Sequence, residues 1–342
     1  MEPVMQYKTL LIYCLLLFMS ACMPVHKTAE QASNPVWPAA PAQPRVIYDF
    51  AFSNAEELGI NRGFWQQLGD FFAGSENIQM VRPMAVAISR DGLIFVADPG
   101  VHGVHRFDLL NNQYDLLRLK DGLELPSPVA LASDQKGNVF VSDSELGKIF
   151  WLTSDAEYAR EVKLDTDLKQ PTGLAVDTVS GHLFVVDTAQ HQVLIFDKGY
   201  LLKRFGKRGK GAGEFNFPTM IWHRQDGSVL VTDSLNFRIQ KFDVEGRYLG
   251  QFGELGDASG YHARPKGLAT DQAGRVYVVD SLFHNVQIFN SAGDFLLDIG
   301  EQGRGKGQFW LPTGIFIDDQ KKIYVADSHN RRIQVFRYPG TE

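Results

Sequence analysis

The stretch PTGIFIDDQKKIYVADSHNRRIQVF, residues 312–336, predicts three short antiparallel strands. The runs GIFI, IYVAD and RIQVF are rich in β-branched and aromatic residues, and short polar turns separate them. In three earlier copies of the pattern a further run follows the third strand, as in YLLKRFG, RYLGQFG and DFLLDIG. Each copy therefore predicts a unit of four strands.

The pattern repeats along the chain. Strand runs that end in aspartate recur six times at intervals of 44 to 47 residues, and a proline precedes each aspartate by 15 or 16 residues. The aspartates are Asp98, Asp143, Asp187, Asp233, Asp280 and Asp327. Four strands in 44–47 residues is the period of a propeller blade. We therefore predict an all-β, six-bladed β-propeller over residues 45–342, with four antiparallel strands per blade.

The two ends of this domain predict how the ring closes. The last unit stops after its third strand, at RIQVFRY, and lacks an outer strand. The run RVIYDFAF, residues 45–52, precedes the first blade and has strand character. We expect this N-terminal strand to complete the last blade, a 3+1 closure.

The segments DSLNFRIQKF, Asp233–Phe242, and DSHNRRIQVF, Asp327–Phe336, resemble NHL repeats. The resemblance covers about three-quarters of the chain. Blades 1 and 2 depart from it, since DPGVHGVHRF and DSELGKIFWL lack the Asn and the Arg. It implies a structural alternative for Arg238 and Arg332, because family members keep an arginine there to bond across blades.

The stretch RFGKRGKGAGEF, residues 204–215, is rich in glycine and basic residues, as phosphate-binding loops are. It lacks the Gly-Lys-Ser or Gly-Lys-Thr that ends the motif of such loops. Its glycines recur at intervals of 47 residues, so that Gly206 is followed by Gly253 and Gly300, whereas its basic residues do not recur. We therefore predict connections between blades, with glycine where the chain turns at positive φ.

The six aspartates are expected to serve the blades, because a short acid at a strand end accepts N–H bonds from its own turn. Four residues after an aspartate stand His102, His191 and His284, in blades 1, 3 and 5. Three histidines on alternate blades suggest a zinc site. These turns are expected away from the axis, however, so the three side chains would be too far apart to bind one ion. We interpret them as exposed turn residues.

Two enzyme families with similar folds give further expectations. In the lyase that cleaves peptidyl-α-hydroxyglycine, zinc histidines follow the blade-opening prolines of alternate blades. Here those positions hold no zinc-type ligand; they are Met84, Val129, Thr172, Thr219, Lys266 and Thr313. Gluconolactonase-like propellers hold calcium with acids in the channel, and no inner strand here contains one, although Asp177 and Asp271 flank such strands. No cofactor is therefore predicted.

The N-terminal segment predicts export. An apolar run, residues 9–18, precedes MSAC, residues 19–22, which resembles the lipobox of bacterial lipoproteins, with lipid attached to Cys22. An uncleaved anchor and a plain secretory signal are the alternatives. Residues 1–22 would then be the signal peptide, and 23–44 a Pro/Ala-rich tether. Within the domain, residues 54–80 form an insertion in which Phe64, Leu68 and Phe71 predict a short amphipathic helix.

Together these features favour a non-enzymatic binding scaffold for an envelope protein, a peptide or a glycan, monomeric and anchored by Cys22 to a bacterial membrane. Met23, directly after the cysteine, resembles the sorting pattern of outer-membrane lipoproteins, so the domain is expected to face the periplasm. The net charge of −6 argues against binding of nucleic acid. The alternative is a hydrolase or lyase that uses zinc or calcium at the channel mouth. The residues expected to bind a partner are His102, His191, Asn236, Arg238, His284, His329, Asn330 and Arg332.

Overall fold

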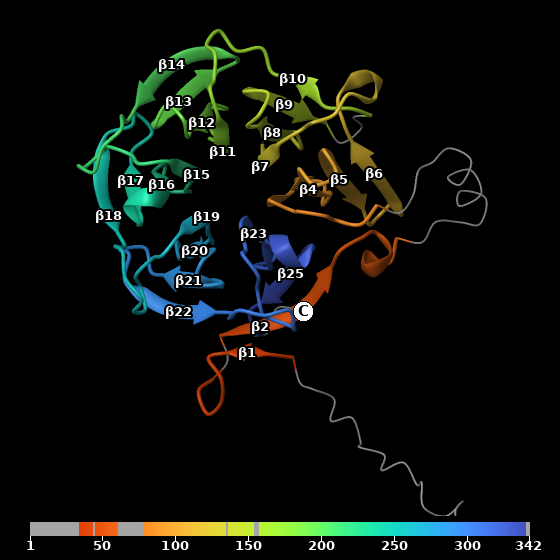
Figure 1. Cartoon of the computed structure of the whole chain (residues 1–342), viewed down its shortest axis with the longest axis vertical. Coiled ribbons are helices and arrows are strands. Elements are labelled where there is room, and N and C mark those ends of the chain that lie inside the picture. Colours follow the sequence, from red (N-terminus) through yellow and green to blue (C-terminus); the bar gives the residue numbers. More distant parts are fainter. Residues whose placement is uncertain (1–33, 44, 61–77, 135, 154–156, 340–342) are drawn as a thin grey trace, which may run out of the picture. The chain divides into compact units, whose positions relative to one another are not determined.

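The computed structural model describes residues 34–43, 45–60, 78–134, 136–153 and 157–339. From Pro35 onward the chain forms one compact unit, in which six antiparallel sheets are arranged as the blades of a ring (Figure 1). This confirms the predicted six-bladed β-propeller. In the described residues no helix has the length and apolar character needed to cross a membrane.

Each of the first five blades is a four-stranded sheet whose strands follow the chain from the ring centre outward. Blade 1 contains β3 (Ala85–Ile88), β4 (Ile94–Asp98), β5 (Gly103–Asp108) and β6 (Gln113–Leu117). Blade 2 contains β7 (Pro128–Ser133), β8 (Val139–Asp143), β9 (Lys148–Leu152) and β10 (Arg160–Glu161). Blade 3 contains β11 (Pro171–Val176), β12 (Leu183–Asp187), β13 (Gln192–Asp197) and β14 (Tyr200–Phe205). Blade 4 contains β15 (Pro218–His223), β16 (Val229–Asp233), β17 (Arg238–Phe242) and β18 (Tyr248–Phe252). Blade 5 contains β19 (Pro265–Thr270), β20 (Val276–Asp280), β21 (Asn285–Phe289) and β22 (Phe295–Ile299).

Blade 6 joins the two ends of the domain. It contains β23 (Ile315–Ile317), β24 (Ile323–Asp327) and β25 (Arg332–Arg337) from the C-terminal end, and β2 (Val46–Phe52) from the N-terminal end. Strand β2 pairs antiparallel with β25 from Ile47 opposite Arg337 to Phe52 opposite Ile333. The expected 3+1 closure is therefore confirmed.

A short fifth strand, β1 (Val36–Trp37), lies outside β2 in the same sheet. The indole of Trp37 packs edge-on against Phe336, with ring centroids 5.7 Å apart. The compact unit consequently starts at Pro35, ten residues before the boundary expected at residue 45. Composition alone did not reveal this extension, because its one large apolar side chain finds its partner at the other end of the chain.

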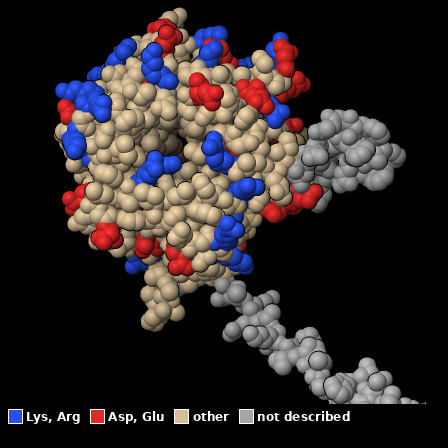
Figure 2. All heavy atoms as spheres, in the orientation of Figure 1, with Lys and Arg blue, Asp and Glu red and all other residues tan. Residues whose placement is uncertain are grey.

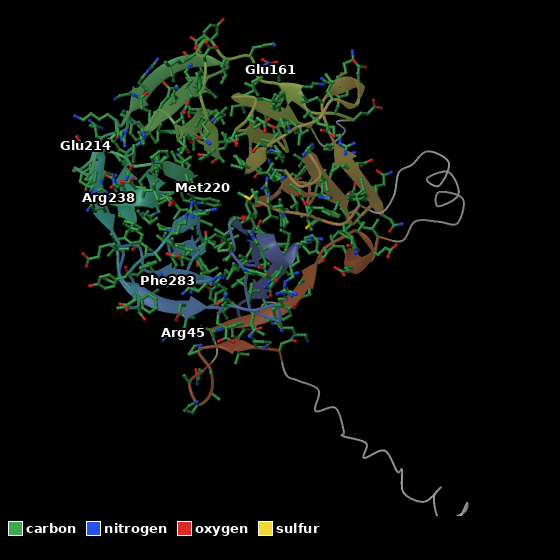
Figure 3. All side chains as sticks on the ribbon, viewed as in Figure 1. Arg45, Glu161, Glu214, Met220, Arg238 and Phe283 are labelled. Atoms are coloured by element: carbon green, nitrogen blue, oxygen red, sulfur yellow. The ribbon has the colours of Figure 1, made fainter. Side chains whose placement is uncertain are left out.

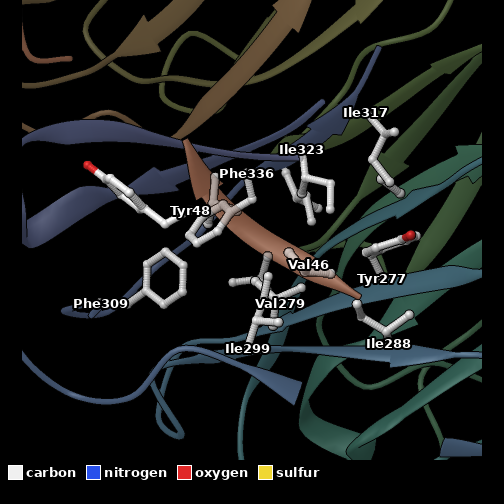
Figure 4. Close-up of a cluster of buried hydrophobic side chains, with 14 residues drawn as sticks. Val46, Tyr48, Tyr277, Val279, Ile288, Ile299, Phe309, Ile317, Ile323 and Phe336 are labelled. Atoms are coloured by element: carbon white, nitrogen blue, oxygen red, sulfur yellow. The ribbon is translucent and has the colours of Figure 1, made fainter. Parts of the chain in front are cut away.

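The core lies between consecutive blades rather than within one sheet. Strands β4, β12, β16, β20 and β24 are buried at every residue, because each middle strand has a neighbouring blade on both faces. Figure 4 shows one such cluster, in which Val46 and Phe336 of blade 6 pack with Val279 and Ile288 of blade 5. Burial of apolar area of this kind is the main stabilising term of the ring.

The glycine-rich segments connect blades 3 to 4, 4 to 5 and 5 to 6, as expected. Each begins with a glycine at positive φ, at +89° for Gly206 and +90° for Gly300. The ring of Phe215 lies against Gly206, and the ring of Phe309 lies against Gly300, so closely that a Cβ on either glycine would clash with it. Glycine is thus required at these positions both for backbone conformation and for ring packing.

Residues 54–60 of the expected insertion are described and contain a single turn of 3-10 helix, η1 (Glu56–Leu58). Ile60 and Met80, at the two ends of the insertion, are buried in the core between blades 1 and 6. The amphipathic helix expected around Phe64, Leu68 and Phe71 lies outside the described residues. So do the signal peptide, Cys22 and residues 23–33.

Candidate functional site

One face of the ring carries the turns that follow the six aspartates together with the connections between blades; we call it the Asp-turn face. In a four-stranded meander these two kinds of loop lie at the same end of the sheet. Hydrogen bonds confirm that they meet, since the Asp98 carboxylate accepts the N–H groups of Val81 (2.7 Å) and Arg82 (2.9 Å) from the segment before β3. It also accepts the N–H of Gly100 in its own turn.

All six aspartates are buried and hold loops in place. Asp233 accepts the N–H of Asn216 from the preceding connection at 2.7 Å, and Asp327 accepts that of Trp310 at 2.8 Å. Burial alone would raise the pKa of Asp98, but its bonds to His105 and to backbone N–H groups outweigh this and lower the pKa. The predicted structural role is therefore supported, with bonds to the preceding connection as well as to the turn.

Arg238 and Asn236 bind the protein's own loop. The Arg238 guanidinium donates to Asp233 (2.8 Å) and to the carbonyls of Gly211 and Glu214, while the Asn236 amide donates to Asp233 and to the Gly209 carbonyl. The same arrangement recurs in blade 6, where Asn330 and Arg332 bond Asp327 and the carbonyls of Gly303, Gly305 and Gln308. These four side chains, expected to bind a partner, thus hold the connections between blades. The structural alternative for the two arginines is the one that the geometry favours.

Three glutamines complete this network and were not anticipated. The Gln240 amide accepts from the N–H of Gly213 and donates to the Glu214 carbonyl and to Asp233. Gln287 and Gln334 make the equivalent bonds to the next two connections. The repeated glutamine of RIQKF, NVQIF and RIQVF was the available signal.

The histidines after the aspartates are placed separately, one in each of three turns. All three have left-handed backbone conformation, with φ between 54° and 56°; they are His102, His191 and His284. Nδ1 of His191 accepts the N–H of Phe217, and Nδ1 of His284 accepts that of Leu311, both at 3.1 Å. His191 is buried, so its interpretation as an exposed turn residue is wrong, because Phe217 of the next connection packs over it. Burial lowers the pKa of both acceptor rings, which favours the neutral acceptor form.

His102 has a different partner from the other two. Its Nδ1 lies 2.6 Å from a carboxylate oxygen of Glu124, at an exposed position. His329 lies in η4 (Ser328–Asn330), where its ring lies 5.9 Å from that of Trp310. Across the part of the chain that the structure describes, no three His, Cys, Asp or Glu side chains are grouped so as to hold a metal ion.

Exposed apolar side chains accompany these loops. They come from the turns and connections of several blades, and two leucines of the connections are 63% and 64% exposed. The residues are Val81, Leu123, Leu146, Phe217, Leu235, Leu255 and Leu282. Since their loops carry the hydrogen-bond network beneath, the Asp-turn face presents apolar groups on a fixed backbone.

The centre of the Asp-turn face is the mouth of a channel lined by the inner strands. The residues that follow the blade-opening prolines form this mouth, and neighbours are bonded across blades: Thr313 Oγ1 lies 2.9 Å from the Met84 carbonyl oxygen. Figure 2 shows the ring hollowed at its centre, with Lys and Arg atoms on the border of the hollow. Figure 3 places Met220, from inner strand β15, near this centre.

Deeper in the channel the inner strands meet through aromatic rings. Trp222 of β15 and Phe316 of β23 form an edge-to-face pair with centroids 6.1 Å apart, although blade 5 separates their blades around the ring. The pair therefore spans the inner edge of blade 5 and places two apolar rings below the mouth.

The opposite face of the ring carries the turns after the inner strands. Asp177 accepts the Val179 N–H and the Ser180 hydroxyl within its own turn, and lies 3.6 Å from Nε2 of His223. Asp271 accepts the Ala273 N–H and pairs with Arg275 at 2.6 Å. Both flanking acids therefore cap turns.

Three cations lie at the mouth on the Asp-turn face. Lys266 follows Pro265, Arg264 precedes it, and Arg82 precedes Pro83 in blade 1. Burial lowers the pKa of Lys266, and the positive charges of Arg264 and Arg82 lower it further.

These repeated blades, with aspartate, asparagine, arginine and glutamine side chains holding each connection, define an NHL-type six-bladed β-propeller. A family model described as 6-bladed beta-propeller matches residues 132–254 and 268–341, more than half of the chain. The protein belongs to this family.

Two curated proteins are similar to parts of the chain. Human E3 ubiquitin-protein ligase NHLRC1 is 35% identical over 81 residues, which are 23% of this chain and 20% of that protein. Peptidyl-glycine alpha-amidating monooxygenase A of Xenopus laevis is 30% identical over 133 residues, 34% of this chain and 14% of that protein. The chain thus spans a fifth or less of the length of these relatives.

Solved structures share the fold. A streptogramin B lyase superposes with a TM-score of 0.60 at 13% identity, covering 77% of this chain and 95% of that one. An auxiliary nutrient binding protein from Bacteroides thetaiotaomicron gives 0.61 at 13% identity, covering 77% and 70%. At such identities the likeness concerns the fold alone.

Proposed function

We propose that the protein is a non-enzymatic binding scaffold whose Asp-turn face receives a protein or peptide partner. The observation that carries the proposal is the set of exposed apolar side chains on this face, which surround a cationic channel mouth. Apolar side chains exposed on one face of a protein are one feature of interaction sites. A face held rigid by buried hydrogen bonds loses little conformational freedom when it binds.

Two further observations support this reading. The aspartates that end the second strands, which would be the obvious acids for chemistry, are buried and bonded to loops. A propeller of similar fold is described as an auxiliary nutrient binding protein, which supports a binding role for this architecture.

We propose that binding takes place in the bacterial envelope, with lipid on Cys22 as anchor and, as spacer, the part of the Pro/Ala-rich segment 23–44 that precedes the compact unit. Substitution of Cys22→Ser should release the protein from the membrane fraction into the soluble fraction. Retention of the variant in the membrane would favour an uncleaved anchor.

The test of the binding face is photo-crosslinking from a defined position. A photoreactive residue at Leu282, on the Asp-turn face, should give one discrete crosslinked partner in native envelopes. The same residue at Leu110, which is 87% exposed in the turn between β5 and β6 on the opposite face, is the matched control. Leu235→Asp should abolish the adduct from position 282. Identical adducts from both faces, or none from Leu282, would contradict the proposal.

The alternative of a metal-dependent hydrolase or lyase at the channel mouth has a separate test. Protein purified without chelators should be analysed for zinc and calcium, and one tightly bound ion per chain would favour the alternative.

A further inference from the structure

The channel mouth on the Asp-turn face holds positive charge that no carboxylate of the described residues pairs with. Lys266 lies on the inner strand β19, next to the axis, and is only partly exposed. Among the described residues, no carboxylate forms an ion pair with Lys266, Arg264 or Arg82, whereas Arg106, Arg238, Arg275 and Arg332 each have one. A partly buried cation without a counter-charge costs free energy, and like charges nearby add to that cost.

The three cations come from two blades that border the mouth. Arg264 and Lys266 flank Pro265 in blade 5, and Arg82 comes from blade 1. Blade 6 lies between these two blades, and its Thr313 donates to the carbonyl of Met84, two residues after Arg82. The positive charge of Arg82 contributes to the lowered pKa of Lys266 from this other blade. Figure 2 shows Lys and Arg atoms on two sides of the central hollow, and Asp and Glu atoms only farther out.

A buried hydroxyl beside these residues lacks a partner. In blades 3 and 4 the residue after the aspartate donates its hydroxyl to the next blade's proline carbonyl, from Thr188 to Pro218 and from Ser234 to Pro265. Ser281 is the blade 5 equivalent and is 2% exposed, yet in the described part of the chain its Oγ has no hydrogen-bond partner. The N–H of Ser281 donates to the carbonyl of Arg264 at 3.1 Å, so this hydroxyl lies beside the cationic segment. A buried donor without an acceptor is costly and rare.

The other blades have an uncharged residue at the position of Lys266, so a positive charge there is not required to form a blade. Three blades place threonine at the position of Lys266, and Thr219 and Thr313 donate hydrogen bonds to neighbouring inner strands. Lys266 makes no such bond, although its carbonyl accepts one from Thr219 at 3.4 Å. Its ammonium therefore has no structural acceptor among the described residues.

We propose that this mouth is a binding site for a ligand that carries a carboxylate or phosphate group, which would lie between Lys266, Arg82 and Arg264. Such an anion accepts charge-assisted hydrogen bonds from guanidinium and ammonium groups and removes their mutual repulsion. The rings of Trp222 and Phe316 lie beneath, where they would contact an apolar part of the same ligand. The site goes beyond the binding face proposed above, since a small anion occupies it whether or not a protein covers the face.

Calorimetric titration of the purified full chain at low ionic strength tests the site, with succinate and inorganic phosphate as probes and succinamide as the neutral analogue. We expect saturable binding of one succinate or phosphate per chain and none of succinamide; the tighter probe identifies the anion. Lys266→Gln should weaken binding at least 10-fold, and Lys266→Arg should restore it to within about 3-fold, because the charge is retained. Lys203→Gln, which removes an exposed charge on the outer strand β14, is the matched control and should change nothing.

Two results would overturn the proposal. One is the absence of saturable binding for both anions, and the other is equal binding by the wild type and Lys266→Gln. Thermal melting of each variant shows that it is folded, and Arg82→Gln replaces Lys266→Gln if the latter unfolds. A failed anion titration leaves the crosslinking result at Leu282 unaffected, so the two proposals are tested separately.

Discussion

Replacing His262 by phenylalanine should stabilise the protein, and more so in acid. His262 ends the connection between blades 4 and 5 at the position that Phe215 and Phe309 occupy in the neighbouring connections, 47 residues to either side. It is fully buried, and neither ring nitrogen has a hydrogen-bond partner among the described residues; a carboxylate oxygen of Asp280 lies 3.8 Å from Nδ1. Its ring lies against Gly253 as the phenylalanine rings lie against their glycines, so the slot accepts a phenyl ring without a clash.

The magnitude follows from the two protonation states. At neutral pH, removing buried polar atoms without partners should raise the free energy of unfolding by about 1–3 kcal/mol. Burial lowers the pKa of His262 from 6.5 to about 4. Between these values the unfolded chain binds more protons than the folded one, so the stability that is complete above pH 6.5 is lost as the pH falls toward 4. At pH 5 this single group should cost roughly 2 kcal/mol relative to pH 7.5.

Urea unfolding at pH 7.5 and pH 5 measures both effects. The wild type should lose roughly 2 kcal/mol more than His262→Phe between the two pH values. Other histidines titrate in both proteins, so the difference between the proteins isolates His262. As a control, Phe309→His should introduce a similar loss in acid. An equal loss with pH in the wild type and His262→Phe, or a less stable His262→Phe at pH 7.5, would refute the reasoning.

Three further substitutions test the parts of the fold described above, each by urea unfolding. Arg238→Met removes the guanidinium that joins Asp233 to the blade 3–4 connection and leaves a buried carboxylate unpaired, so about 3–5 kcal/mol of stability should be lost; a loss below 1 kcal/mol would contradict this role. Gly300→Ala places a Cβ at φ +90° against a buried ring and should lower stability by more than about 1 kcal/mol, whereas Gly227→Ala, which has φ +78° but open space around it, should cost less. Trp37→Ala removes the packing of β1 on blade 6 and should cost about 1–3 kcal/mol; no change would mean that β1 adds no stability.

The blades could be predicted because each is encoded by local signals that repeat. Asp327 ends a strand, Gly300 begins a connection, and a proline opens the next inner strand, all within one period. The closure by residues 45–52 was also predictable, since the last unit visibly lacked a strand. Most of the fold could therefore be predicted from the repeat period and from the residues that form turns.

The candidate site was less predictable, because it depends on contacts between distant segments. His191 has turn character in the sequence, and Phe217 of the following connection packs over it. Asn236 and Arg238 are polar and would be expected at the surface. In the structure they donate hydrogen bonds to carbonyls of the connection some 25 residues earlier. Lys266 owes its environment partly to Arg82, which lies in another blade. The spacing of residues in the sequence does not show which charged side chains of different blades lie near each other.

The closure of blade 6 has a consequence for synthesis on the ribosome. Strand β2 is among the first parts of the domain to be made, and its partner β25 is the last, since Phe52 pairs with Ile333. Blades 1 to 5 lie between these two strands in the sequence, so they are made before β25 is available to pair with β2. Until then the hydrogen-bonding edges of β2 and of the newest blade are open to other nascent chains. A message truncated shortly before residue 332 would therefore yield five blades and an incomplete sixth, with both edges permanently exposed.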